Sequence, residues 1–379
     1  MDDLQRDLAA LLRQREIIRA RERMLPFMKL IQPDPDDPEN PEASQYVETP
    51  LARLLCQVIE KVDKGEEKRV CVSVGPQMGK SQVLSRGGPA WLSGRRPSRH
   101  MILGSYNDTF AQEFGGEVRS IMRTPAFSQV FPKHGLQKGS EAKNLLITNK
   151  NGKMAFVGVG GSGTGKPADI FFVDDPIKSD EDAASEVFRE KLWTWFNRTV
   201  FSRCHNDSAV IVVHTRWHED DLIGRLCDPT HPERHKKYKG VADQWKYYNL
   251  PAVVEDPALA AALDLTLAEP TDPVVVQQFG KKPMVSLWEK RKGLRFLAEA
   301  KQMDAAGWRI LHAQGHRRVR LAERPAGASS RLLRQRSRDR REAAQRLQRA
   351  RRLWRRRERR HLGSARLHHG PDEDRPDRR

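Results

Sequence analysis

The chain has 379 residues, of which 31% are charged, and its formal net charge at pH 7 is +18. It has no apolar stretch long enough to span a bilayer and no apolar core of a secretory leader, so we expect neither a membrane protein nor a secreted one. Its four cysteines lack Cys-x-x-Cys spacing, which is typical of free thiols in a reducing cytoplasm. They are Cys56, Cys71, Cys204 and Cys227.

The beginning of the chain falls into three segments of contrasting composition. Residues 1–32 are rich in Leu, Arg, Glu and Gln and predict a helical segment. Residues 33–48 are acidic and proline-rich and predict a linker. Across residues 49–255, apolar strand-like runs alternate with helix-like segments, which is typical of a parallel sheet with helices on both faces. The predicted fold class is therefore α/β.

Two helices of this third segment can be placed from their patterns. Residues 108–122 follow the strand-like run 100–105, and Asp108 is a candidate N-terminal cap. Residues 182–198 predict a second helix, whose apolar side chains have helical spacing and are expected to face the core rather than to stack on DNA. These side chains are Val187, Trp193, Trp195 and Phe196.

A phosphate-binding loop is predicted where the apolar run 70–74 meets a helix-compatible segment, 82–92. In such a loop, backbone N–H groups and a helix N-terminus face an anion. Lys80 would reach the β/γ-phosphates of a nucleoside triphosphate, and the Ser81 hydroxyl could ligate Mg²⁺. A chance Gly-Lys-Ser in a surface turn is the alternative. The predicted loop consists of Gly75, Pro76, Gln77, Met78, Gly79, Lys80 and Ser81.

An acidic pair follows a second apolar run, residues 170–173, and consists of Asp174 and Asp175. The run is typical of a buried parallel strand, whose carboxyl end lies where open α/β sheets bind ligands. Asp174 would help to hold Mg²⁺, and Asp175 would orient and deprotonate the attacking water. The alternative is a strand that ends in a polar turn, but the presence of both motifs favours a nucleotide site.

A third strand-like run, residues 209–213, also ends in polar residues. Thr215 could sense the γ-phosphate, and Arg216 could pair with phosphate or with a catalytic carboxylate. His214 and His218 are four residues apart, but they follow a strand and have no further ligand cluster, which disfavours a metal site. The glycine-rich residues 158–165 are interpreted as a loop and not as a second phosphate site, because Pro167 and a strand follow.

These motifs and their order resemble the large subunit of a tailed-bacteriophage terminase over about residues 46–303. The resemblance rests on Tyr106-Asn107, the glycine-rich run, the acidic strand end and the run Thr215 to Leu222. It implies an ATP-driven motor that threads viral double-stranded DNA into a preformed capsid, using ATP and Mg²⁺. It further implies the terminase small subunit and the capsid portal as partners, a homo-oligomer as the active form, and the cytoplasm of a bacterial host as the location.

The resemblance also assigns roles to individual residues. Lys80 and Ser81 match the phosphate and Mg²⁺ contacts, Asp174 and Asp175 match the acidic strand end, and Thr215 and Arg216 fall in the motif that couples hydrolysis to movement. One departure concerns an arginine that family loops carry ahead of Gly-Lys, where this loop has Gln77-Met78. Arginine contacts of this kind are worth about 10³ to 10⁵ in rate. Either the charge comes from Arg86, Arg216 or a neighbouring subunit, or hydrolysis by this chain is slow.

The composition changes abruptly near the end of the sequence. Residues 316–379 hold 23 Arg, no Lys and 8 acidic residues, a net of +15, and predict a disordered tail. A shift of reading frame near residues 307–317 explains this composition better than a DNA-binding basic arm does, although the arm remains the alternative. Residues 256–315 are interpreted as the connection to a nuclease domain, and no acidic cluster for a two-metal nuclease follows, so we expect no nuclease activity.

Two other functions fit the same motifs. A helicase-type, nucleic-acid-dependent ATPase shares the phosphate loop and the acidic strand end. A prophage remnant without activity, which binds DNA through its basic tail, belongs to a different class. Unwinding of a short duplex would favour the first, and DNA binding at low salt without ATP hydrolysis would favour the second.

Overall fold

The computed structural model describes residues 2–40, 43–140, 142–161, 167–227, 245–305 and 307–308. These residues belong to the first of two units of the chain, Met1–Val319. The predicted basic tail, the residues at the proposed frame shift beyond Trp308, and residues 162–165 of the glycine-rich loop lie outside the described residues.

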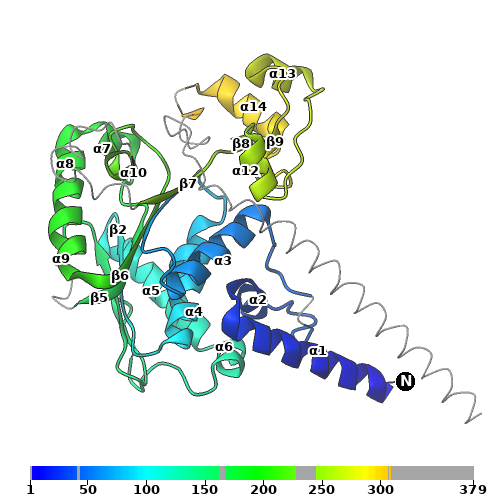
Figure 1. Cartoon of the computed structure of the whole chain (residues 1–379), viewed down its shortest axis with the longest axis vertical. Coiled ribbons are helices and arrows are strands. Elements are labelled where there is room, and N and C mark those ends of the chain that lie inside the picture. Colours follow the sequence, from blue (N-terminus) through cyan, green and yellow to red (C-terminus); the bar gives the residue numbers. More distant parts are fainter. Residues whose placement is uncertain are drawn as a thin grey trace, which may run out of the picture. The chain divides into compact units, whose positions relative to one another are not determined.

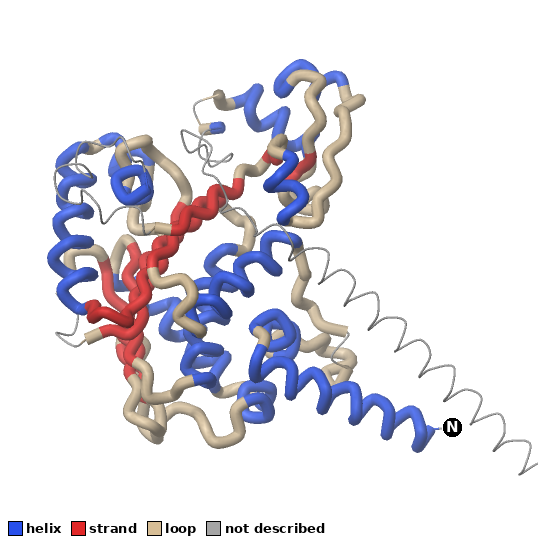
Figure 2. Tube along the Cα trace, viewed as in Figure 1, coloured by secondary structure: helices blue, strands red, loops and turns tan. Residues whose placement is uncertain are grey.

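A seven-stranded sheet is the centre of this unit, in the order β3-β4-β2-β5-β6-β1-β7 (Figures 1 and 2). Its neighbouring strands are parallel except for the antiparallel pair β3 and β4. The strands are β1 (Arg69–Val74), β2 (His100–Ser105), β3 (Leu145–Ile147), β4 (Lys153–Gly158), β5 (Ala168–Asp174), β6 (Cys204–His214) and β7 (Lys246–Leu250).

Helices cover both faces of the sheet, as the sequence predicts (Figure 1). One face carries α1 (Asp2–Glu22), α2 (Met24–Leu30), α3 (Pro50–Asp63), the π-helix η1 (Gln82–Gly87), α4 (Gly88–Arg95), α5 (Asp108–Met122) and α6 (Pro125–Val130). The other face carries α7 (Asp180–Ala184), α8 (Glu186–Trp195), the π-helix η2 (Phe196–Val200), α9 (Phe201–Arg203) and α10 (Leu222–Cys227). The α/β fold class is therefore confirmed, and the N-terminal segment forms helices.

The central strands are buried on both faces because helices pack on each side. In β5, the run 170–173 is at most 2% exposed, and in β6 the run 209–213 is at most 4% exposed. Near-continuous apolar runs of this kind are what parallel strands covered on both faces require. The runs of β1, β5 and β6 end at the same edge of the sheet, since Ser73 pairs with His214 and Asp174 pairs with Val213.

Two local expectations are wrong. The cap of α5 is Asn107, whose side chain accepts a hydrogen bond from the Phe110 N–H at 2.8 Å, whereas Asp108 accepts from the Gly158 N–H. Val187 is 80% exposed, although Trp193, Trp195 and Phe196 are buried as expected. The predicted helix is interrupted at Ser185, which caps α8, so Val187 lies in the first turn of a separate helix.

The residues that follow β7 form a small lobe. It consists of β8 (Val253–Val254), α12 (Pro257–Ala262), α13 (Pro273–Phe279), β9 (Val285–Ser286) and α14 (Leu294–Met303). Strands β8 and β9 pair antiparallel, and α13 packs against α14. We call these residues, 253–303, the C-terminal lobe. Within the described part of the chain, no helix is both long enough and apolar enough to cross a membrane.

Candidate nucleotide-binding site

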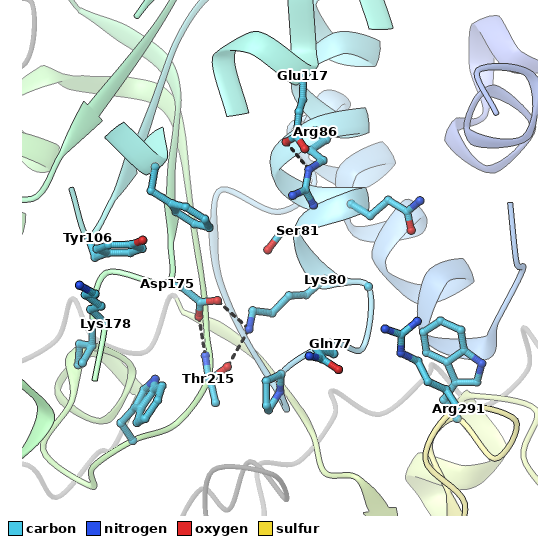
Figure 3. Close-up of a pocket in the computed structure, with 17 residues that line it drawn as sticks. Gln77, Lys80, Ser81, Arg86, Tyr106, Glu117, Asp175, Lys178, Thr215 and Arg291 are labelled. Carbon is cyan, nitrogen blue, oxygen red and sulfur yellow. Dashed lines mark hydrogen bonds and ion pairs between the residues drawn. The ribbon is translucent and has the colours of Figure 1, made fainter. Parts of the chain in front are cut away.

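A cavity of about 650 Å³ opens at the edge of the sheet where β1, β5 and β6 end (Figure 3). Its lining includes the predicted loop residues Gln77, Lys80 and Ser81 together with Asp175 and Thr215. Its volume is in the range usual for small-molecule sites, which are commonly found at such an edge. The structure therefore brings together predicted residues that are up to 139 positions apart in the sequence, from Pro76 to Thr215.

The phosphate loop turns sharply between β1 and η1. Gln77 has a φ of 59° and Gly79 a φ of 83°, both in the left-handed region that glycine adopts most easily. Gly75 and Pro76 lead out of the strand, and Met78 is 2% exposed and fixes the loop on the core. The loop thus presents backbone N–H groups at the start of a helical segment, although that segment begins as a π-helix and not as an α-helix.

Lys80 is the centre of the polar contacts. Its ammonium group donates to the Thr215 Oγ1 at 2.7 Å and forms an ion pair with the Asp175 Oδ2 at 2.8 Å (Figure 3). Only 5% of the residue is exposed. A buried ammonium is stable only with such partners, so the loop lysine is held in place by the ends of β5 and β6.

Asp174 lies at the end of β5 and is fully buried. Burial and the neighbouring Asp175 carboxylate raise its pKa to about 6, against smaller opposing effects of Lys80, Ser85 and Ser81. The Ser85 hydroxyl donates to its Oδ2, whereas its Oδ1 is buried without a hydrogen-bond partner among the described residues. A buried carboxylate oxygen without a partner is suited to an additional ligand.

Asp175 follows in a backbone conformation that few residues tolerate, with a φ of 40°. Its Oδ1 accepts the Thr215 N–H at 2.9 Å while its Oδ2 faces Lys80. The turn at the end of β5 thus points two adjacent carboxylates in different directions, one into the core and one into the cavity. This arrangement agrees with different roles for Asp174 and Asp175.

Arg216 does not line the cavity in the structure. Its guanidinium donates to the Asp221 Oδ2 at 2.6 Å and to the Tyr247 hydroxyl at 3.2 Å, and the residue is 7% exposed. His214 Nε2 lies 3.5 Å from the same Asp221 carboxylate. Alternating side chains of an extended segment point to opposite sides. Thr215 therefore faces Lys80, whereas His214 and Arg216 face Asp221.

Contacts within this buried cluster keep both Asp221 and Arg216 charged. Burial alone would raise the pKa of Asp221, but Arg216 and His214 lower it to about 2. Burial alone would lower the pKa of Arg216, but Asp221 and Tyr247 raise it above its ordinary value. Asp221 and Arg216 thus form a charged pair behind the cavity. The sequence predicted that Arg216 pairs with phosphate or with a catalytic carboxylate, whereas its partner in the structure is Asp221.

A magnesium ion fits the Ser81 hydroxyl, which lines the cavity, and the Asp174 carboxylate, which is buried behind it. The Ser81 hydroxyl and the Asp174 carboxylate supply oxygen ligands of the kind that Mg²⁺ prefers, and the Asp174 Oδ1 has no protein partner among the described residues. Magnesium ordinarily completes its coordination with water and substrate phosphates. Across the described ranges, no group of three or more His, Cys, Asp or Glu side chains is arranged to hold a metal by itself, His214 and His218 included.

Sequence reasoning missed several residues of the cavity. Trp288 and Arg291 come from the C-terminal lobe, more than 200 positions after the phosphate loop, and no local pattern connects them to it. Arg86 was named only as a possible charge source, and it forms an ion pair with Glu117 at the cavity wall. Tyr106 also lines the cavity, and its place directly after β2 was the signal that could have found it.

A family model described as terminase large subunit, T4likevirus-type, N-terminal, matches residues 71–302. The chain belongs to this family. The match extends from β1 to α14, so it includes the phosphate loop, the acidic strand end and the C-terminal lobe. None of the curated proteins compared with the chain matches it.

Similar solved structures are also phage terminases. The HK97 bacteriophage large terminase is 13% identical, with a TM-score of 0.46 over 78% of this chain and 55% of that protein. The Thermus phage P74-26 large terminase ATPase domain is 12% identical, with a TM-score of 0.41 over 72% and 95%. The large terminase of a thermophilic bacteriophage in complex with ADP is 11% identical, with a TM-score of 0.27 over 50% and 44%. The chain thus spans little more than half of the HK97 terminase.

Proposed function

We propose that this terminase family member is an ATP-hydrolysing motor subunit that moves double-stranded DNA into a viral capsid. The observation that carries the proposal is the convergence on Lys80, where the phosphate loop, the acidic strand end and the end of β6 meet within hydrogen-bond distance. This arrangement supplies a phosphate contact, a base and a phosphate sensor at one cavity. Family membership supports DNA packaging as the use of that chemistry.

Nucleotide binding must rearrange the contacts of Lys80. In the proposed mechanism, the ammonium group leaves the Asp175 carboxylate and pairs with the β- and γ-phosphates, while the backbone N–H groups of residues 75–81 hold the phosphate chain. Asp175 then has a free carboxylate oxygen that faces the cavity. This oxygen orients a water molecule and accepts its proton as the water attacks the γ-phosphorus.

The remaining groups stabilise the developing negative charge. When bound, Mg²⁺ would be held by Ser81 and Asp174 and would neutralise charge on the phosphate oxygens. Thr215 hydrogen-bonds Lys80 and therefore responds to the position of the ammonium group. Arg86, which lines the cavity, replaces the arginine that family loops carry at the position of Gln77-Met78.

The test is ATP hydrolysis by the full chain with and without double-stranded DNA, with Lys80→Ala as the matched variant. We expect DNA-stimulated turnover that falls at least about 100-fold in Lys80→Ala, because the phosphate contact and the Asp175 partner are lost together. Unwinding of a short duplex would instead favour a helicase-type ATPase. DNA binding without any Lys80-dependent hydrolysis would contradict the motor and point to a DNA-binding remnant.

A further inference from the structure

One turn of the C-terminal lobe lies on the phosphate loop. It consists of residues 287–292, between β9 and α14, and we call it the lobe turn. The Lys292 ammonium donates to the Pro76 carbonyl at 2.8 Å, across 216 positions of sequence. The Trp288 Cζ3 lies 3.9 Å from the position that a Cβ on Gly79 would take. The lobe turn therefore contacts both the beginning and the end of the phosphate loop.

The conformation of the lobe turn is fixed from within. The Ser286 hydroxyl donates to the Lys292 carbonyl at 2.6 Å and accepts the Trp288 N–H at 3.1 Å. The Leu287 N–H donates to the Ala252 carbonyl at 2.9 Å, which attaches the turn to the segment that leaves β7. A contact built on such a turn is held in position before any ligand binds.

Trp288 and Arg291 of the lobe turn line the cavity. Arg291 lies at the end of the cavity away from Asp175 (Figure 3). The Arg291 guanidinium lies 5.2 Å from the centroid of the Trp288 ring, so the two groups stack. Among the described residues, no acidic side chain forms an ion pair with Arg291. A flat indole and a guanidinium form a surface that accepts planar, polarisable groups.

The direction of a bound nucleotide follows from the phosphate contacts. The proposed site of water attack lies beside Asp175, and Lys80 lies between Asp175 and Arg291, whose guanidinium is over the Trp288 ring (Figure 3). A triphosphate with its γ-phosphate at Asp175 extends its nucleoside toward the lobe turn. Its planar base then reaches the aromatic side chain that packs over Gly79.

We infer that Trp288 stacks on the nucleobase and that Arg291 borders the same subsite, an inference that rests on the proposed ATPase function. Stacking on an aromatic ring is tolerant of base identity, because every base has a π-face. The lobe turn contributes affinity for the nucleoside, whereas the phosphate loop contributes affinity for the phosphates. The two contributions can be measured separately with ligands that have or lack a base.

The experiment is calorimetric titration of the full chain with MgADP and, separately, with magnesium pyrophosphate, which has no base. Trp288→Ala should bind ADP about tenfold more weakly and pyrophosphate as tightly as the original chain does. Trp288→Phe should recover most of the ADP affinity because it restores a ring. The control is Phe296→Ala, which removes a half-exposed ring of α14 in the same lobe and should change neither affinity.

Unchanged ADP affinity in Trp288→Ala would overturn the inference, and so would an equal loss for ADP and pyrophosphate, because the indole would then only support the phosphate loop. Lys80→Ala separates this failure from that of the proposed function. If the unmodified chain binds both ligands in a Lys80-dependent manner, the phosphate site stands whatever Trp288 does. If Lys80→Ala changes neither affinity, the proposed ATPase function fails together with the inference.

Discussion

The ammonium group of Lys80 lies 2.8 Å from the Asp175 carboxylate, so the phosphate-binding lysine is paired with the carboxylate to which we assign the role of general base. Both groups are thereby held beside the cavity, and neither can act until the pair separates. In the proposed mechanism, phosphate competes for the lysine and frees the carboxylate when a substrate is present. The pair would then link the binding of phosphate to the availability of the base.

Asp175→Asn should abolish most of the hydrolysis while preserving nucleotide binding. Asparagine tolerates the left-handed backbone at this position and can still accept the Thr215 N–H, so the local structure should persist. Loss of a general base lowers kcat by about 10² to 10⁴. Single-turnover hydrolysis and ADP titration measure the two effects. A kcat within threefold of the original would assign the base to another residue.

Asp174→Asn should stabilise the fold and yet reduce activity. Because burial raises the folded-state pKa of Asp174 to about 6 from 3.8, the folded state binds a proton between these values that the unfolded state does not. The free energy of unfolding therefore falls as pH rises from 4 to 6, by about 3 kcal/mol for this group, and the cost persists above pH 6. The amide variant does not lose this free energy of unfolding, because asparagine does not ionise.

Urea unfolding of Asp174→Asn and of the original chain at several pH values checks this prediction. The variant's advantage in stability should grow from pH 4 to pH 6 and then level off. Its hydrolysis at saturating ATP should need more Mg²⁺, since an amide is a poorer magnesium ligand than a carboxylate. An advantage in stability that is independent of pH would show that the carboxyl is not protonated in the fold.

Arg216→Ala should lower the free energy of unfolding strongly and change kcat little. Removing one member of a buried ion pair costs about 3 to 5 kcal/mol, because the remaining Asp221 carboxylate is left without its main partner. Well below the unfolding temperature, kcat should stay within about tenfold. Asp221→Ala is the matched variant, and both should shift the urea midpoint similarly. A loss of about 10³ in kcat for Arg216→Ala alone would restore its catalytic assignment.

Arg86→Ala should lower kcat by about 10³ with little change in KM, if this side chain supplies the charge that the phosphate loop lacks. Glu117→Gln is the informative partner, because it removes the acid that forms an ion pair with Arg86 and leaves the arginine in place. It should retain activity. Steady-state kinetics of both variants check this prediction. A kcat of Arg86→Ala within threefold of the original would point to an arginine from another subunit.

The strands of the site could be predicted from the sequence because each is a short apolar run directly followed by one of the predicted motifs. The runs 70–74, 170–173 and 209–213 all form buried parallel strands, and their ends meet as the fold class requires. Choices between adjacent residues were less predictable. Asn107 and Asp108 are both good caps, and only the approach of Gly158 decides that Asp108 bonds to a neighbouring strand end instead.

Contacts between segments that are far apart in the sequence could not be predicted. The sequence places Arg216 beside Thr215, but the alternation of an extended segment turns the two side chains to opposite sides, toward Asp221 and Lys80. Trp288 and Lys292 reach the phosphate loop only because β7 pairs with β1 and delivers the C-terminal lobe to that edge of the sheet. Such contacts depend on topology, which local patterns do not encode.

The position of β1 between β6 and β7 has a mechanical consequence. Five residue pairs align β1 with each neighbour, and sliding one strand by a single residue would turn its buried side chains toward the opposite face. We therefore expect these three strands to move together as one rigid body. If the chain is the motor that we propose, the movement that hydrolysis drives would then arise in the loops at the ends of these strands.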